Sequence, residues 1–378
     1  MTGETPATMD ITDVRRHHLS IVLDRLVRNG PRSRAALAQE TGLTKATVSL
    51  LVAELLNRDL VEELDTPRDG RVGRPGTDVA AAGFRVGGLG LEIDVDRVAA
   101  LIVDLTGEVR VRRVHCGDNR KVLSGRVVDR LRSLVRQVLA DADAAGIQCV
   151  GGTLALPGLV DPVSGRLFVA PNLHWFDADV ASAMERLELP PSLPMTVDNE
   201  ANLAALAELR LGAGRGLSSF VYVSGGIGIG AGIVLDGRLA RGAHGFAGEL
   251  GHVIVDPAGR PCVCGARGCL ETIAGADTDA SRDEMAEALA VALRSVVHII
   301  DPEAILLGGS FSSLGDDFAA TVRDRMHGIT VGARWSRCDV RLAALGADAT
   351  LVGAATVALD GVLADPTIVP ARPSIRTA

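Results

Sequence analysis

The sequence is poor in aromatic residues and has no long hydrophobic run. Aromatic residues make up 3% of the 378 residues, whereas hydrophobic residues make up 47%. Small and aliphatic side chains must therefore build the core, which is typical of the packed helices and strands of an α/β protein. No stretch reaches the roughly 20 apolar residues of a membrane span, and the first residues lack the apolar segment of a signal peptide. We expect a cytoplasmic protein of two or three domains with no membrane partner.

The chain also has fewer basic than acidic residues. It carries 39 Lys and Arg residues against 47 Asp and Glu residues, a net charge of −8. Nearly all of this excess negative charge lies after residue 80, and an acidic body argues against nonspecific binding of nucleic acid by the whole chain. Any DNA-binding role therefore depends on where individual basic residues lie within the first 80 residues.

Residues 1–80 have the pattern of a winged helix-turn-helix domain. Apolar residues recur at helical spacing over 14–27, and Ser33 and Thr44 can cap two further helices that meet at a turn at Gly42. LVEEL (60–64) then reads as a strand and 65–79 as a basic wing. Any three helices with a glycine turn can imitate this pattern, and the wing is equally plausible as a flexible linker. The basic wing favours DNA binding.

In such a domain the third helix enters the major groove, and the wing reaches the minor groove or the phosphate backbone. We therefore expect operator DNA as a partner. The alternative for the two wing arginines is a solvated loop. The residues that we expect to contact DNA are Ser33, Lys45, Ala46, Thr47, Ser49, Arg71 and Arg74.

Three of the six cysteines lie within eight residues of one another. Cys262, Cys264 and Cys269 follow His252, and this set supplies the four N and S ligands of a structural Zn²⁺ with no open position for water. Reduced surface thiols are the alternative, which the crowding of the three cysteines makes a poor one. The other cysteines are isolated, and we expect them to be small core residues: Cys116, Cys149 and Cys338.

The stretch VSGGIGIGAGIVLDGRLARGAHGFAGELGH (223–252), together with the cysteine loop, closely resembles the signature of the ROK family of sugar kinases and sugar-responsive repressors. The helix-turn-helix resembles the repressor branch. This resemblance implies an α/β, two-lobed, ribonuclease H-like fold of the actin and hexokinase type, with a sugar between the lobes. We expect a DNA-binding domain over 1–80, a first lobe over 81–198 completed by a helix over 350–365, a second lobe over 199–349, and a loose tail over 366–378.

The resemblance also implies which residues contact the sugar. Carboxylates and amides suit this role because sugar hydroxyls both donate and accept hydrogen bonds. His252 would bind zinc through one ring nitrogen and face the sugar with the other. The alternatives are that Asn199 caps the following helix and that the glutamates are solvated loop charges. The implied effector-binding residues are Asn172, Asn199, Glu200, Glu249, His252 and Glu271.

Several departures from the kinase pattern predict that phosphoryl transfer is lost. EIDVDR (92–97) lacks the glycines and the threonine of the phosphate-gripping DxGxT turn, and Gly225 stands where a second loop would have threonine. Glu200 replaces the aspartate base, and the segment after Glu271 is short. We predict a sugar-responsive repressor that acts as a homodimer or homotetramer and has no catalytic residue. The alternative is an active ATP-dependent cytoplasmic sugar kinase with an N-terminal regulatory segment, since glutamate is still a base.

Overall fold

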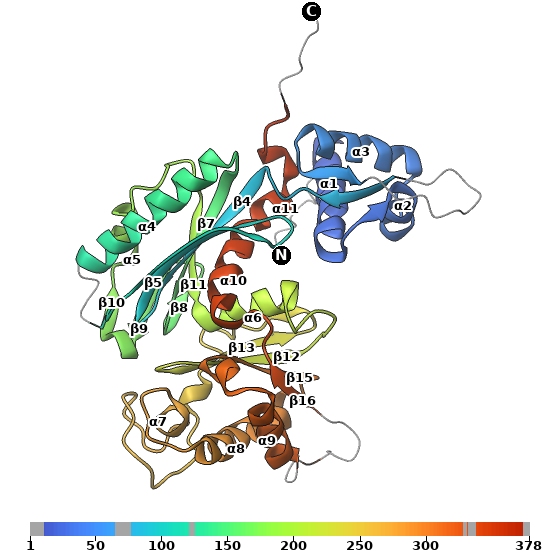
Figure 1. The fold of residues 1–378 in the computed structure, drawn as a ribbon. Coiled ribbons are helices and arrows are strands. Elements are labelled where there is room, and N and C mark those ends of the chain that lie inside the picture. The colour runs from blue at the N-terminus through green and yellow to red at the C-terminus, as the bar shows by residue number, and fades with distance from the viewer. Residues whose placement is uncertain (1–10, 65–76, 121–124, 328–330, 332–337, 373–378) are drawn as a thin grey trace, which may run out of the picture.

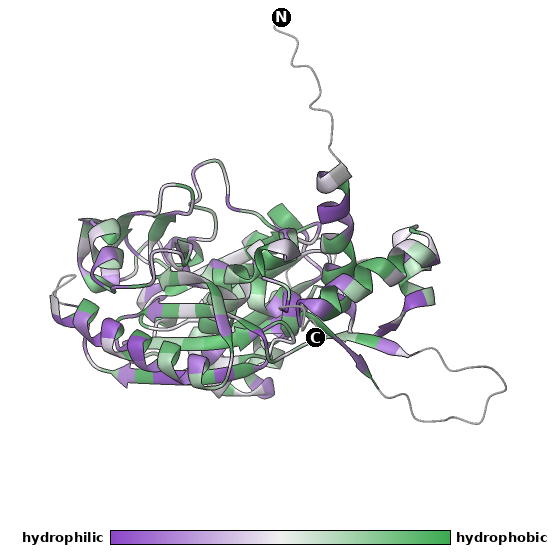
Figure 2. Ribbon diagram, turned by 90° about the horizontal axis from the view of Figure 1, so that it is seen from above, coloured by the Kyte–Doolittle hydropathy of each residue, from purple (hydrophilic) through white to green (hydrophobic). Residues whose placement is uncertain are grey.

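The computed structural model describes residues 11–64, 77–120, 125–327, 331 and 338–372. Figure 1 shows an N-terminal helical unit beside the first of two α/β lobes, with the second lobe below. In Figure 2, the outer helices carry both hydrophilic and hydrophobic residues, as expected for helices with one buried face.

The N-terminal unit is a winged helix-turn-helix, as predicted. Its buried side chains come from the apolar positions of the three helices, among them Leu19, Leu23, Val48 and Leu55. A small sheet of order β1-β3-β2 packs beside them, and β3 pairs antiparallel with both neighbours. The elements are α1 (Ile11–Asn29), β1 (Arg32–Ser33), α2 (Arg34–Thr41), α3 (Lys45–Asn57), β2 (Val61–Leu64) and β3 (Asp78–Ala81).

The two lobes are built on sheets of the same topology. The first has the order β11-β7-β4-β5-β6 and the second the order β14-β13-β12-β15-β16. In each, the first three strands in chain order are antiparallel and the last two join in parallel. This repeated order confirms the predicted ribonuclease H-like fold. The strands are β4 (Val86–Ile93), β5 (Arg97–Asp104), β6 (Val109–Cys116), β7 (Gln148–Leu156), β11 (Met195–Asn199), β12 (Phe220–Gly225), β13 (Ile229–Leu235), β14 (Arg238–Leu239), β15 (Ala304–Gly309) and β16 (Asp339–Leu342).

Two helices lie between the sheets, and others cover their outer faces (Figure 1). Helix α6 (Glu200–Leu211) packs on β13, and α10 (Ala349–Ala358) packs on both α6 and β4. Helix α4 (Gly125–Ala144) covers the first sheet, whereas α8 (Arg282–Ile300) and α9 (Asp316–His327) belong to the second lobe. The remaining elements are β8 (Leu159–Asp161), β9 (Arg166–Ala170), η1 (Pro171–Leu173), β10 (Trp175–Ala178), α5 (Val180–Glu185), η2 (Leu250–His252), α7 (Glu271–Ala274), η3 (Ser310–Leu314), η4 (Gly346–Asp348), α11 (Asp360–Ala364) and η5 (Pro366–Ile368).

The segment Gly346–Ala364 is long and apolar enough to cross a membrane by composition alone. It is 56% buried within the protein, and every residue from Ala349 to Thr356 is buried. Because α10 packs between the two sheets, the core accounts for its apolar character.

The structure differs from the expected boundary at residue 80 and from the expected loose tail. The core of the helix-turn-helix continues into the first lobe and into the C-terminal segment through Val86, Leu105, Val362 and Val369. Figure 1 shows α11 between the first lobe and α1. Residues 366–372 pack against the helix-turn-helix, and the backbone N–H of Arg372 donates to the carbonyl of residue 57 at 2.8 Å. The helix-turn-helix unit and the C-terminal segment that the structure describes therefore share one core.

Candidate functional site

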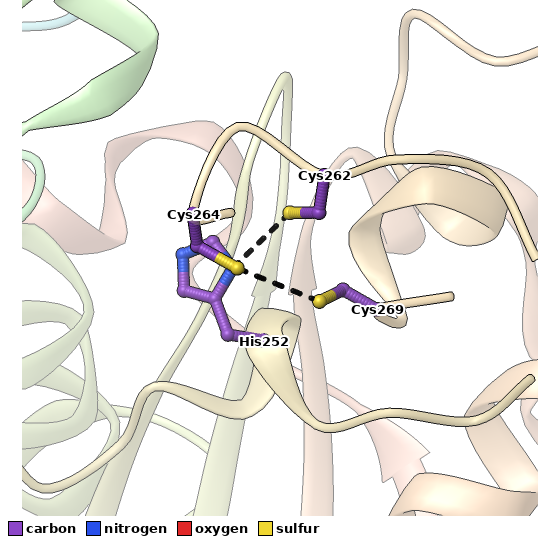
Figure 3. A group of neighbouring side chains, drawn as sticks. All are labelled: His252, Cys262, Cys264 and Cys269. Carbon is purple, nitrogen blue, oxygen red and sulfur yellow. Dashed lines mark hydrogen bonds between the residues drawn. The ribbon is translucent and has the colours of Figure 1, made fainter. Parts of the chain in front are cut away.

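The structure brings together the four predicted metal ligands (Figure 3). His252 ends the short helical turn η2, and the loop that carries Cys262, Cys264 and Cys269 folds back through an antiparallel bridge between Ile254 and Cys269. The Nδ1 or Nε2 atom of the histidine and the three Sγ atoms lie within 4.8 Å of one another. A single ion could therefore contact all four.

The spacing of these atoms fits a tetrahedral metal. The Sγ atoms of Cys264 and Cys269 are 3.7 Å apart, and Sγ of Cys262 is 3.6 Å from Nδ1 of His252. Zinc bonds of about 2.3 Å to sulfur and 2.0 to 2.1 Å to nitrogen would set these separations at about 3.8 Å and 3.6 Å. Burial raises the pKa of the Cys262 thiol to about 12 and also raises that of Cys269, whereas a backbone hydrogen bond from Ala266 lowers the pKa of Cys264. Thiolates at Cys262 and Cys269 would therefore need a nearby cation. The residues present fit such a cation.

Two glutamates flank the histidine of this cluster. Oε1 of Glu271 lies 3.6 Å from Nδ1 of His252 and 3.4 Å from Sγ of Cys262, whereas Oε2 of Glu249 lies 3.9 Å from Nε2 of His252. Nδ1 thus faces the cysteines and Nε2 faces Glu249. Burial raises the pKa of Glu249 despite the neighbouring His252, which lowers it. The sugar contact of the second ring nitrogen, which the resemblance implied, stays a prediction.

Asn172 and Glu271 approach each other from opposite lobes. Asn172 lies in η1 of the first lobe and Glu271 begins α7 of the second. Both side chains point at Gly228: a Cβ atom there would lie 2.5 Å from Nδ2 of Asn172 and 3.5 Å from Oε2 of Glu271. The structure therefore brings Asn172 close to the group of Glu249, His252 and Glu271.

A cavity of about 780 Å³ lies between the lobes. Its volume is within the range of small-molecule sites. Asn172 and Glu200 line it, as does Gly228, whereas Glu249, His252 and Glu271 are not among its lining residues. Glu92 and residues 94–97 form part of its wall from the first lobe, and residues 224–228 form part from the second. The two segments that correspond to kinase phosphate loops thus face the same space.

The wall contributed by the first lobe is acidic. Glu92 is 2% exposed and pairs with Arg97, whose Nε lies 2.8 Å from Oε2 of Glu92. Burial raises the pKa of Glu92 to about 7, although Arg97 opposes this shift. Asp94 and Asp96 also line the cavity, at the positions where the kinase turn would have glycine and threonine. Carboxylates at these positions would repel the phosphates of a nucleotide.

The arginines that line this cavity do not offset the acidic wall. Arg97 is paired with Glu92, and Nη2 of Arg112 lies 2.8 Å from Oδ1 of Asp348.

Burial, followed by the charges of Asp94 and Glu92, raises the pKa of Glu200 well above its ordinary value. Because only an ionised carboxylate can accept a proton, this shift narrows the pH range over which Glu200 could act as a general base.

Asn199 is already engaged as a helix cap. Its Oδ1 accepts hydrogen bonds from the backbone N–H groups of Ala201 and Asn202 at 2.9 and 3.1 Å, and its Nδ2 donates to the carbonyl of Gly158 at 2.9 Å. One amide hydrogen is left for a ligand. The capping role that was the alternative for this residue is therefore present in the structure.

The expected DNA-contacting residues divide into caps and exposed positions. The hydroxyl of Ser33 caps α2 by accepting from the backbone N–H of Ala36 at 3.2 Å. Lys45, Ala46 and Ser49 are exposed on α3, and Thr47 is half-buried. The remaining expected contacts, Arg71 and Arg74, lie outside the described residues.

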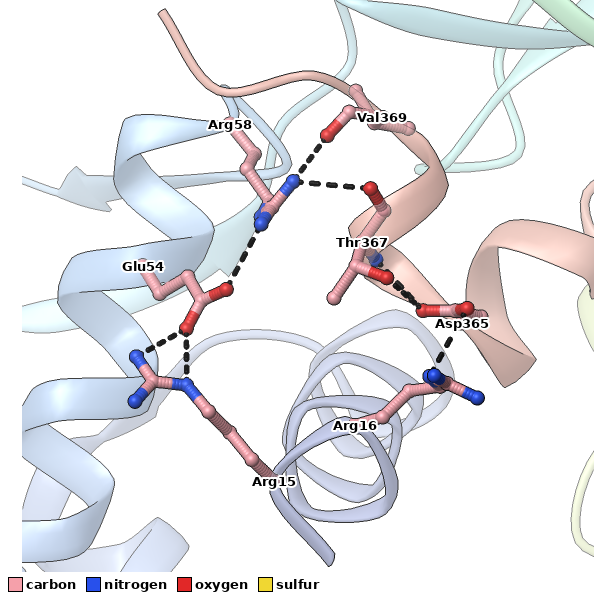
Figure 4. Close-up of polar contacts among 7 residues, drawn as sticks. All are labelled: Arg15, Arg16, Glu54, Arg58, Asp365, Thr367 and Val369. Carbon is pink, nitrogen blue, oxygen red and sulfur yellow. Dashed lines mark hydrogen bonds and ion pairs between the residues drawn. The ribbon is translucent and has the colours of Figure 1, made fainter. Parts of the chain in front are cut away.

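The sequence analysis missed a group of contacts that joins the helix-turn-helix to the C-terminus (Figure 4). Glu54 of α3 accepts from Nε of Arg15 at 2.8 Å and from Nη2 of Arg58 at 3.0 Å. Arg58 also donates to the carbonyls of Thr367, at 3.2 Å, and Val369. We call Glu54, Arg58 and these two carbonyls the C-terminal clasp. The only sequence signal for it is the i, i+4 spacing of Glu54 and Arg58.

The isolated cysteines behave differently from one another. Cys338 is buried and Cys149 is partly buried, and burial raises the pKa of both thiols. The expectation for Cys116 is wrong, because Cys116 is exposed at the end of edge strand β6, where most side chains face solvent.

Comparison with known proteins places this architecture in a family. A sequence model of the ROK family matches residues 88–280 and 275–361, and a model of the MarR family matches residues 20–72. These ranges include both lobes, the metal-ligand loop and the helix-turn-helix.

Individual relatives include both regulators and kinases. The xylose repressor of Bacillus subtilis (strain 168) is 31% identical over 272 residues, which cover 70% of this chain and 68% of that protein. A glucokinase of Halalkalibacterium halodurans is 31% identical over 248 residues, which cover 54% of this chain and 74% of that protein. A ROK family transcriptional regulator, described as a homolog of E. coli MLC, shares the fold with a TM-score of 0.74 and 23% identity over 93% of this chain and 97% of that one. The chain belongs to the ROK family and carries a MarR-type winged helix-turn-helix domain ahead of its two lobes.

Proposed function

We propose that the chain is a sugar-responsive transcriptional repressor whose two lobes bind a sugar but do not phosphorylate it. The observation that carries this proposal is one continuous core. The helix-turn-helix packs on α11, which directly follows α10, and α10 lies between the two lobes. A change in the cleft thus has a direct structural route to the DNA-reading unit.

In this proposal the cleft holds a sugar through Asn172, Glu249, His252 and Glu271, with Glu200 on the cavity wall. Asn172 and Glu271 come from different lobes and meet at Gly228. A ligand held by both residues would favour the closed arrangement of the lobes. It can shift that equilibrium only by binding one arrangement more tightly than the other.

The metal cluster has a structural role in this proposal, with Zn²⁺ as the ion. Its four ligands complete a tetrahedral shell and leave no position for substrate or water. A bound ion would cross-link His252 to the cysteine loop, so that His252 and the adjacent Glu271 keep their positions beside Gly228. Every ligand comes from the second lobe.

The acidic wall argues against kinase activity. Glu92, Asp94 and Asp96 occupy the region where a kinase would cradle phosphates, and both arginines of the lining are paired. The raised pKa of Glu200 favours its neutral form, which cannot take a proton from a sugar hydroxyl. Glucokinases match this chain at similar identity, so an active sugar kinase is the alternative. ATP turnover by the protein would favour that alternative.

On DNA, we propose that a cytoplasmic homodimer or homotetramer presents two winged domains to a palindromic operator. Dimers of such domains read half-sites about one helical turn apart. Lobe closure would alter the relative placement of the pair through α10, α11 and the C-terminal clasp. Lys45 and the wing arginines Arg71 and Arg74 would supply phosphate contacts.

Thermal unfolding of the full chain against a panel of monosaccharides, their phosphates and ATP tests this proposal. A ligand of the native state raises apparent stability by RT ln(1 + [L]/Kd), about 2.7 kcal/mol at 100 times Kd. We expect a shift with one free sugar and none with ATP. A shift with ATP, followed by sugar-dependent ADP release in a coupled assay, would show an active kinase instead.

A further inference from the structure

Helix α3 presents an outward face with an apolar stripe along its middle. Ala46, Leu50 and Ala53 lie one helical turn apart on the side opposite the buried residues of the helix. All three are exposed, and Leu50 is 69% exposed. A leucine this exposed at the centre of a recognition helix gains little from folding, because most of its surface stays in water.

The polar side chains of α3 are largely used within the protein. The hydroxyl of Ser49 donates to the carbonyl of Lys45 at 2.9 Å, and Thr47 shares a hydrogen bond with the hydroxyl of the capping threonine at 2.9 Å. Glu54 is held by two arginines. Asn57, at the far end of the helix, is exposed. The middle of the outward face therefore has no long hydrogen-bonding side chain.

Base edges in the major groove can be read by hydrogen bonds or by apolar contact, and the apolar feature of the groove is the C5-methyl group of thymine. We propose that Leu50, flanked by Ala46 and Ala53, reads thymine methyl groups, so that sequence preference depends more on methyl contact than on hydrogen bonds to bases. This inference rests on the proposed operator binding. It adds the chemistry by which the site would distinguish one sequence from another.

Charge beside this face favours DNA over a second copy of the chain as its occupant. Lys45 lies at the start of α3, is exposed, and has no ion pair among the described residues. A free cation next to an apolar stripe suits a phosphate backbone that borders a groove. Contact between two copies through this face would instead bring the two Lys45 side chains toward one another or leave each without a negatively charged partner.

The test begins with double-stranded sites selected from a random DNA library by the full-length protein. Each thymine in the selected half-site is then replaced by deoxyuridine, which removes only the C5-methyl group. Burying one methyl changes affinity by about fourfold. We expect one or more single replacements to weaken binding by about that factor, measured by fluorescence anisotropy at fixed salt.

Leu50→Ala provides the second arm. This variant should bind the unmodified site more weakly and should lose most of the distinction between thymine and deoxyuridine at the contacted position. Ile299→Ala is the matched control, because Ile299 is 82% exposed on α8 of the second lobe. It should retain both the affinity and the distinction.

The outcomes separate this inference from the proposed function. If the wild-type protein binds the selected site specifically and every deoxyuridine replacement leaves affinity within twofold, methyl reading is overturned while operator binding stands. Equal thymine preference in Leu50→Ala and wild type would overturn the role of Leu50. If no sequence is enriched, the proposed operator binding fails, and the inference fails with it.

Discussion

Arg58→Ala should detach the C-terminal segment from the helix-turn-helix. The Arg58 side chain is 15% exposed and donates to the carbonyls of Thr367 and Val369 as well as to Glu54. Hydrogen bonds from a charged donor contribute about 1.5 to 3 kcal/mol each, but these carbonyls can regain water after the substitution. We therefore expect the free energy of unfolding to fall by about 2 to 3 kcal/mol. Truncation to alanine also removes the packing of the arginine stem.

Hydrogen exchange of the backbone amides measures this effect where it should occur. We expect lost protection in residues 365–372 and in α11, together with a lower urea midpoint. Arg28→Ala is the matched control on the same domain, because Arg28 is 55% exposed and pairs only locally with Asp24. An exposed pair of this kind contributes about 0.3 to 0.5 kcal/mol. Equal effects of the two substitutions, or unchanged exchange at 365–372, would refute a docking role for Arg58.

Three further predictions concern the metal, the cleft and the helices between the lobes. Cys264→Ser should lower the metal content from one Zn²⁺ per chain, measured by mass spectrometry under native conditions, and should lower the melting temperature; unchanged zinc content would contradict the ligand set. Burial raises the pKa of Glu92 from 4.5 to about 7 in the folded protein, so the unfolded chain ionises at lower pH. The stabilisation that this shift provides is complete below about pH 4.5 and is lost as the pH rises to about 7. Glu92→Gln should make the melting temperature depend less on pH over this range. An unchanged pH dependence would contradict the raised pKa of Glu92. Gly353→Ala would place a Cβ 1.9 Å from the carbonyl oxygen of Leu203 on α6, and it should lower the free energy of unfolding by several kcal/mol. Gly361→Ala is the control and should be tolerated, because the nearest atom to its Cβ would be 3.9 Å away. Equal melting temperatures of the two variants would contradict tight packing of α10 on α6.

Features encoded by neighbouring residues could be predicted from the sequence. The Cys₃His set comes from one continuous segment, from His252 to Cys269, and the structure brings its ligands together. The caps of α2 and α3 are similarly local, since Ser33 and Thr44 bond amides three residues onward. The two-lobed, ribonuclease H-like fold was implied by the family resemblance, and the matching strand orders of the two sheets confirm it.

Features that depend on distant partners could not be predicted in this way. Arg58 contacts carbonyls more than 300 residues away along the chain, and no local pattern marks such a pairing. The tail is rich in proline and lacks periodicity, yet Val369 is fully buried beneath the helix-turn-helix. Cys116 was misplaced because an edge strand leaves a small apolar residue exposed. Asn199 is a mixed case: its cap of α6 is local and was the alternative stated from the sequence, whereas its hydrogen bond to the carbonyl of Gly158 depends on a distant partner.

The motif comparison alone did not reveal the charges on the wall of the cleft, among them the pairing of Arg97 with Glu92. The comparison recorded only which kinase residues are missing from 92–97. The structure shows that Asp94 and Asp96 line the cavity at those positions, beside the ion pair between Glu92 and Arg97. The loss of a phosphate grip is thus accompanied by acidic side chains whose pKa burial raises.

The most direct test of sugar-gated DNA binding is the affinity of the full-length protein for its selected operator, measured with and without each monosaccharide of the panel. Coupling between two sites is typically 1 to 3 kcal/mol, a change of about 5- to 150-fold. The account predicts a change of this size with one sugar, and a smaller change with the same sugar in Arg58→Ala. Identical operator affinity with and without every sugar that binds the cleft would contradict it.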